Sequence, residues 1–249
     1  MVRLLLNCSL REDKNTLVWS TGSQIISALV TLSIGACKAR IPLPMVVVPV
    51  LDTMALFLRR GELYLSNPHH VTLSLSTLLA VPLDNVKTED YYSVFLAMHE
   101  VLFSVLQCHP KVMLKSVPTF LSCFHRLVAS VMREGQQKGD KGASCVVKCA
   151  KLVERMYTYI AAKTEEFTVF STSIVSQFLY ELQKVTLLPE VKKYLTEGIF
   201  HIIDLCIDRD TKFLNASLHI GAREVFKELY HDYSSHYKTS NQEEEKYTV

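Results

Sequence analysis

Apolar residues recur every three or four positions along most of the chain after residue 88, a spacing that gathers them on one face of an α-helix. The clearest case is a stripe formed by Tyr91, Phe95, Met98, Leu102 and Val105. Thr88 precedes this stripe and is predicted to cap the helix, which ends before Pro110. Repetition of the pattern predicts six successive helices between residues 88 and 238.

Proline, glycine and small polar residues predict where the later helices begin and end. The second helix is predicted to begin at Pro118 and to be followed by a solvated loop over residues 133–144. Ser171 is predicted to cap the fourth helix and Pro189 to lie in the first turn of the fifth. The segment that contains Gly221 opens the last helix.

The first 87 residues carry a weaker helical pattern. Residues 16–60 are predicted to form two helices separated at residues 38–44, where two prolines remove backbone donors. A loop is expected over 61–70 and a short helix over 71–80. These predictions describe a second helical segment upstream of the regular one.

Two stretches in this upstream segment, residues 25–37 and 41–58, are unusually apolar. A helix that spans a membrane needs about 20 nearly uninterrupted apolar residues. The first stretch is too short, and the second contains three prolines and Asp52. Both are therefore interpreted as buried core, and no membrane partner is expected.

Long helices with few breakers predict an all-α fold. Pairs of predicted helices recur roughly every 45 to 55 residues, slightly longer than the ~40 to 47 of HEAT and armadillo repeats. An irregular helical solenoid is the expected architecture, with an irregular helical bundle as the alternative. The expected organisation is a segment over 1–87, a module over 88–238 and a polar tail over 239–249.

Charge and cysteine usage narrow the function. The chain has 27 Lys and Arg and 25 Asp and Glu, so its net charge is +2. It lacks the large excess of positive charge that is typical of proteins that neutralise many phosphates. Nucleic acid, if bound, is contacted locally. The seven cysteines form no short paired framework, which indicates a reducing compartment and no disulfides.

The sequence contains no phosphate-binding glycine loop, no pair of close zinc-ligand motifs and no recognisable protease or hydrolase motif. Carboxylate pairs such as Asp208 with Asp210 fall at helix boundaries, where they are expected to cap. The chain is accordingly expected not to be an enzyme and to hold no cofactor or metal. A hydrolase with a buried site remains an alternative.

The last predicted helix carries one candidate surface. Four aromatic residues share one of its faces: Phe226, Tyr230, Tyr233 and Tyr237. Arg223 and Lys227 lie on another face, and with Tyr230 they are candidates for contact with RNA or a partner protein. The alternative is that the aromatic rings pack against the preceding helix, with Phe226, Tyr233 and Tyr237 docking the last helix.

A basic row is the second candidate surface. Lys148, Lys151 and Arg155 share the helix face opposite an apolar stripe. Such a row is either a solvated face or a contact for an acidic partner or an RNA backbone.

Three segments carry a family resemblance: residues 147–171 (VKCAKLVERMYTYIAAKTEEFTVFS), residues 198–210 (GIFHIIDLCIDRD) and residues 219–238 (HIGAREVFKELYHDYSSHYK). Their order resembles the C-terminal region of the nucleolar family called unhealthy ribosome biogenesis protein 2, or nucleolar pre-ribosomal-associated protein 2. The likeness is strongest over residues 145–249. Because members of that family are much longer, the chain is expected to be a fragment, an alternative product or an incomplete gene model.

The resemblance implies a nucleolar assembly factor of the large ribosomal subunit that acts in ribosomal RNA processing without catalysis. It also implies association with pre-ribosomal particle proteins, among them a large scaffold partner and a DEAD-box RNA helicase. A local contact with pre-ribosomal RNA is possible on this reading. The alternative function is a helical adaptor in transport or trafficking, which the same composition would suit.

Overall fold

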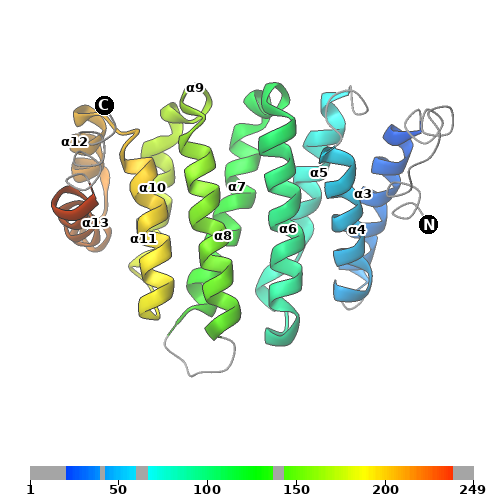
Figure 1. Ribbon diagram of the computed structural model, residues 1–249, viewed down its shortest axis with the longest axis horizontal. Helices are drawn as coiled ribbons and strands as arrows, with labels where there is room; N and C mark the ends of the chain where they lie inside the picture. The colour runs from blue at the N-terminus through cyan, green and yellow to red at the C-terminus, as the bar shows by residue number, and fades with distance from the viewer. Residues whose placement is uncertain (1–20, 40–42, 60–66, 137–142, 238–249) are drawn as a thin grey trace, which may run out of the picture. The chain divides into compact units, whose positions relative to one another are not determined.

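The computed structural model describes residues 21–39, 43–59, 67–136 and 143–237 (Figure 1). All the regular elements within these ranges are helices, and the only β-type pairing among them is an isolated bridge between Gln136 and Leu187. The all-α fold class is therefore confirmed. The chain divides into two compact units, residues 1–127 and 128–249, and each is described by itself. The expected division at residue 87 stays a prediction.

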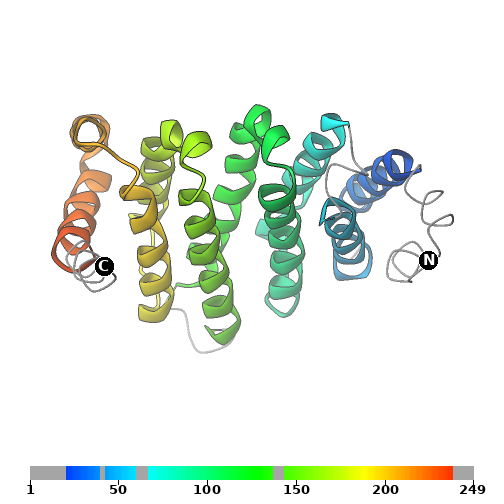
Figure 2. The ribbon, with the colours of Figure 1, turned by 45° about the horizontal axis from the view of Figure 1, so that its top comes forward.

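The first unit contains α3 (Gly22–Lys38), α4 (Leu43–Arg59), α5 (Pro68–Ala80), the short 3-10 turn η1 (Leu83–Asn85), α6 (Thr88–Cys108) and the first part of α7 (Pro110–Glu134). Helix α4 packs along α6, and α3 packs on both α4 and α5 (Figures 1 and 2). Alternate helices are thus neighbours, an arrangement compatible with both the solenoid and the bundle that the sequence suggests.

The apolar stretches near the start of this unit form α3 and α4. Helix α4 buries Val47, Leu51, Met54, Phe57 and Leu58 completely. Their interpretation as core is confirmed for α4 and for one face of α3, which buries Ile26 and Val30 but leaves Leu32 53% exposed. Among the residues that the structure describes, no helix is both long enough and apolar enough to cross a membrane.

Two side chains from later in the chain cap the C-terminal ends of α4 and α5 in this unit. His109 Nε2 donates to the carbonyl of Leu58 at 2.8 Å, next to the last residue of α4. Arg126 on α7 donates to the carbonyls of Leu78, Leu79 and Val81 at 3.1, 2.8 and 2.8 Å. Carbonyls in the last turn of a helix lack partners within the helix, so these contacts satisfy the end of α5.

The second unit contains the end of α7, then α8 (Ala143–Ala161), α9 (Thr164–Phe167), the 3-10 turn η2 (Thr168–Phe170), α10 (Ser171–Leu182), α11 (Pro189–Ile203), α12 (Asp208–Ser217), α13 (Ile220–Asp232) and the π turn η3 (Tyr233–Tyr237). Helices α8 and α11 form the main packing pair (Figures 1 and 2). Helix α10 contacts α11, α12 and α13.

Gly198 allows α8 and α11 to approach closely. A Cβ atom at this position would lie 2.8 Å from Tyr157 Cδ2 and 3.0 Å from Glu154 Cα on α8. Glycine is therefore required for packing and not for an unusual backbone angle. The first residues of α8 and of α11 line the same cleft, and further along the two helices Gly198 faces Glu154. Helices α8 and α11 therefore run in the same direction.

Several predicted helix starts are wrong. Pro118 lies inside α7, which begins eight residues earlier at Pro110. Thr88 and Ser171 are the first residues within α6 and α10, and the cap positions before them are Lys87 and Phe170. Neither cap makes a side-chain hydrogen bond, because lysine and phenylalanine side chains have no oxygen that could accept from the first helical amides.

Two helices in the described region were not predicted, and one loop was predicted too long. Helices α9 and α12 are additional to the six expected after residue 88. Helix α5 begins at Pro68, capped by the Asn67 side chain, so the expected loop does not extend to residue 70. The expected helix over 71–80 and the position of Pro189 in the first turn of α11 are both confirmed.

Candidate interaction site

The basic row of Lys148, Lys151 and Arg155 lies on the outer side of α8. All three side chains are exposed. The Nζ atom of Lys151 lies 5.0 Å from the centre of the Tyr194 ring on α11, a cation–π contact that links the two helices. The row therefore borders the junction between α8 and α11.

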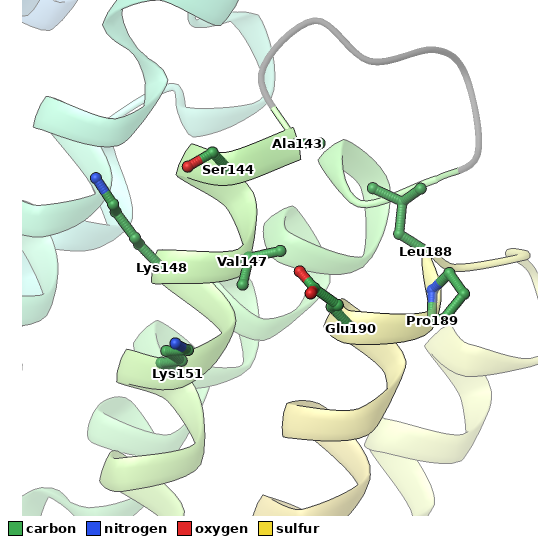
Figure 3. Close-up of a pocket in the computed structure, with 8 residues that line it drawn as sticks. All are labelled: Ala143, Ser144, Val147, Lys148, Lys151, Leu188, Pro189 and Glu190. Atoms are coloured by element: carbon green, nitrogen blue, oxygen red, sulfur yellow. The ribbon is translucent and has the colours of Figure 1, made fainter.

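A cleft with a volume of about 460 Å³ opens at this junction, between the N-terminal ends of α8 and α11 (Figure 3). From α8 it is lined by Ala143, Ser144, Val147, Lys148 and Lys151, and from the start of α11 by Leu188, Pro189 and Glu190. The wall is predominantly apolar, with two lysines on one side and a carboxylate on the other. Sequence patterns placed both lysines on one helix face but gave no sign of the cleft.

Backbone contacts fix one side of this cleft. The amide of Leu188 donates to the carbonyl of Gly135 at 2.9 Å, and the neighbouring residues Gln136 and Leu187 form the isolated bridge. Pro189 occupies the first turn of α11, where its missing N–H costs no hydrogen bond. A Cβ atom on Gly135 would meet Val191 Cγ1 at 2.8 Å, so only glycine fits beneath the start of α11.

The electrostatic character of the cleft is cationic on the α8 side. The positive ends of the dipoles of α8 and α11 both lie at the cleft, and Lys148 and Lys151 add two full charges. Glu190 supplies one negative charge in the first turn of α11, a position that stabilises the helix. In Figure 3 the Glu190 side chain points toward Val147, whereas Lys148 extends away from α11.

The candidate residues on the last helix are engaged within the protein. Arg223 is half-buried, and its Nη2 donates to the carbonyl of Leu218 at 2.9 Å and to that of Ala216 at 3.4 Å, which caps the end of α12. Lys227 pairs with Glu224 at 2.8 Å on the surface. These contacts give Arg223 a structural role, and leave Lys227 as an exposed cation beside a carboxylate.

The aromatic residues of α13 pack together. Phe226 is 1% exposed and Tyr233 is 6% exposed, whereas Tyr230 is half-buried between them, with ring centres 5.7 and 5.6 Å away. Tyr233 contacts the Phe200 ring on α11 at 5.6 Å. The side chain of Tyr237 lies outside the described residues.

A second cleft of about 540 Å³ lies between the segment 182–189 and α13. Its lining mixes apolar residues with Lys192, Glu228 and Asp232. The buried hydroxyl of Thr196, which also lines it, has no hydrogen-bond partner among the described residues. The lysine belongs to α11 and both carboxylates belong to α13, so this cleft is anionic along α13, whereas the first cleft is cationic along α8.

Buried cysteines show little nucleophilic character. Burial raises the pKa of Cys123 and of Cys149 to about 12, so both thiols stay protonated near neutral pH. Burial also raises the pKa of Cys206, although a hydrogen bond from Ser171 opposes the shift. Among the residues described, no three side chains of His, Cys, Asp or Glu gather as metal ligands would.

Asp210 behaves as its position predicts. Its Oδ2 accepts a hydrogen bond from the amide of Ile207 at 3.1 Å, at the start of α12. The expected capping role is confirmed for this carboxylate.

The family model described as the Urb2/Npa2 family matches residues 48–242 of the chain, which include both clefts and the basic row. No solved structure matches the chain.

Proposed function

Because the chain belongs to the Urb2/Npa2 family, which acts in ribosome biogenesis, we propose that it is a non-catalytic scaffold in nucleolar assembly of the large ribosomal subunit. The observation that carries the proposal is the match over residues 48–242, since it covers most of both helical units. The biochemical role within that process, which is to hold other factors, is inferred from the surfaces described above.

The helical structure supports a binding role. Two of its arginines hold neighbouring helices together, as the Arg126 and Arg223 caps show. The outer face of α8 instead presents Lys148, Lys151 and Arg155 on a rigid helix beside an apolar cleft. Surfaces of this kind serve recognition because a partner finds them already formed.

The proposed partners are pre-ribosomal particle proteins, including a large scaffold protein and a DEAD-box RNA helicase. The basic row is proposed as a contact for one of these partner proteins or for pre-ribosomal RNA, and in either case each lysine or arginine adds a salt-sensitive attraction. Residence in the nucleus, and specifically in the nucleolus, follows from the same proposal.

Affinity purification of the tagged protein from nuclear extract, with and without RNase, tests this function. Recovery of large-subunit precursors and nucleolar factors is expected, and the factors that survive RNase are those held by protein contacts. Recovery of vesicle or transport components, with no ribosomal precursors, would show that the protein is an adaptor of another pathway.

A charge-reversal variant tests whether the basic row is the surface that holds the recovered particles. Lys148→Glu with Arg155→Glu is expected to reduce recovery of the particles without lowering the melting temperature. Arg209→Glu with Lys212→Glu changes two exposed cations on α12 by the same amount and serves as the matched control. Equal losses from both variants would indicate a general effect of charge.

A further inference from the structure

The cleft between the N-terminal ends of α8 and α11 has an apolar floor and a positively charged side. Val147, Leu188 and Pro189 supply apolar surface, and Lys148 and Lys151 supply positive charge along one side. The remaining charged lining residue is Glu190 (Figure 3). A ligand that satisfies this wall must present an apolar group to the floor and negative charge to α8.

The lining favours a protein segment over RNA. Single-stranded RNA is held by stacking its bases on exposed aromatic rings, and none of the eight lining residues is aromatic. The Tyr194 ring on α11 already carries the Lys151 ammonium group over its face at 5.0 Å. The apolar floor has no use in binding a phosphate backbone, whereas it suits an aliphatic side chain.

We propose that this cleft docks an acidic peptide segment of a partner protein, with one aliphatic side chain inserted between Val147 and Leu188 and its carboxylates directed toward Lys148 and Lys151. The proposal rests on the scaffold function and specifies the chemistry of one partner. The volume of about 460 Å³ is within the range of roughly 300 to 1,000 Å³ typical of ligand sites, so one inserted side chain and its adjoining backbone fit.

Charge complementarity makes the arrangement directional. The two lysines and the positive end of the α8 dipole attract carboxylates along α8, while the Glu190 carboxylate, which offsets the dipole of α11 and points toward Val147, repels them from the apolar floor (Figure 3). The bound segment therefore directs its acidic residues toward α8 and its neutral residues toward α11. Arg155, one turn beyond Lys151 on the exposed face, extends the attraction for a longer acidic segment.

Fluorescence anisotropy with the purified full chain tests the proposal. The probe is a short fluorescein-labelled peptide of Asp and Glu with a single central Leu. The comparison probes are the same peptide with central Ala, a Lys-rich counterpart with central Leu, and a uridine oligonucleotide. The acidic Leu peptide is expected to bind more tightly than every comparison probe.

Variants connect the binding to the cleft. Lys148→Glu with Lys151→Glu is expected to weaken the acidic Leu peptide by roughly tenfold or more at low salt, whereas Arg209→Glu with Lys212→Glu leaves it unchanged. Glu190→Gln is expected to tighten it severalfold. Val147→Ser is expected to weaken the Leu peptide more than the Ala peptide, which measures the coupling between residue 147 and the inserted side chain.

Three outcomes would overturn the proposal: no measurable binding of the acidic Leu peptide, binding of the uridine oligonucleotide at least as tight, or equal losses in both charge-reversal pairs. These outcomes are distinguishable from failure of the scaffold function. If the purification recovers ribosomal precursors while the peptide fails to bind, only the role of the cleft is lost.

Discussion

The hydroxyl of Tyr233 donates a hydrogen bond to the carboxylate of Asp204, which joins the π turn after α13 to the residue that follows α11. The same ring packs at 5.6 Å on Phe200, one turn before Asp204. Tyr233 is 6% exposed, so its ring and hydroxyl both contribute to holding the C-terminal end of the chain on the second unit.

Substitutions at Tyr233 separate these two contributions. Tyr233→Phe is expected to lower the free energy of unfolding by about 1 kcal/mol, because it removes the hydrogen bond and keeps the ring. Tyr233→Ala is expected to cost about 3 kcal/mol or more, since it also leaves a cavity. Urea denaturation followed by circular dichroism measures both. Tyr180→Phe, at a 54% exposed residue, is the control and should change little. Equal effects of the Phe and Ala variants would mean that the ring contributes nothing.

Alanine at two glycines is expected to have opposite effects. Gly198→Ala should destabilise by about 1–3 kcal/mol, because its Cβ would meet the α8 backbone at 3.0 Å and the Tyr157 ring at 2.8 Å. Gly35→Ala in α3 should stabilise by about 0.5–1 kcal/mol, since no atom lies within 4 Å of the new methyl group and alanine favours a helix. Thermal unfolding of the two variants side by side checks the signs. If Gly198→Ala left the stability unchanged, α8 and α11 would have moved apart at little cost in free energy.

Arg126 is expected to stabilise the end of α5. Arg126→Ala removes three hydrogen bonds to the carbonyls of Leu78, Leu79 and Val81 and should cost about 2 kcal/mol. Arg126→Lys should retain only part of this stabilisation, since one ammonium group cannot reach all three carbonyls as the two nitrogens of the guanidinium group do. Hydrogen exchange of the amides in α5 is the local measurement. Unchanged exchange in Arg126→Ala would contradict the capping role, and Arg209→Ala on exposed α12 is the control.

Stability should fall in mildly acidic solution through His70. Burial, with a smaller contribution from neighbouring His69, lowers the pKa of His70 below its ordinary value of 6.5. His70 therefore binds a proton more readily in the unfolded chain than in the folded one. Its contribution to the free energy of unfolding is complete above about pH 6.5 and is lost as the pH falls toward the lowered pKa. No hydrogen-bond partner for Nδ1 lies among the described residues.

The measurement for His70 is the free energy of unfolding at about pH 7.5 and about pH 5.5, in the natural protein and in His70→Gln. The decrease between the two pH values should be smaller in the variant. His69→Gln, at an exposed neighbour, should retain most of the decrease. A decrease that is the same in all three proteins would assign the pH dependence to other groups.

Apolar periodicity predicted the helices that bury a continuous face. The stripe from Tyr91 to Val105 is buried as expected, and α11 buries Val191, Leu195 and Ile199 completely. Helix α12 was missed because only Leu214 of its ten residues is buried, and one apolar position makes no periodic pattern. It is held by the Asp210 cap and by Arg223, which are contacts of single residues.

Proline gave the wrong boundary in α7 for a physical reason. The missing amide of Pro118 leaves the carbonyl of Leu114 without its partner in the helix. Pro118 and Leu114 both lie on the exposed face of α7, where a carbonyl can bond to solvent and the helix can continue. The hydroxyl of Ser122 also donates to the Pro118 carbonyl at 2.8 Å. Sequence reasoning applied the rule for buried helix interiors to an exposed face.

The candidate site could be predicted only in part. The spacing of Lys148, Lys151 and Arg155 was enough to put them on one exposed face. The cleft beside them depends on Gly135 and Leu188, whose backbone contact joins segments that are distant in the sequence. Arg223, chosen from the sequence as a surface cation, instead caps α12, because whether a cation meets solvent or a carbonyl depends on the neighbouring helix.

The Arg126 cap has a consequence for the order in which the chain is made. Its partner carbonyls lie 45 to 48 residues upstream, so a ribosome that adds roughly 5–20 residues per second needs about 2 to 10 s to supply the side chain that covers the end of α5. During that interval the last turn of α5 is exposed to water and to chaperones. Slower translation between the emergence of α5 and the emergence of Arg126 would prolong this exposure without changing a single amino acid.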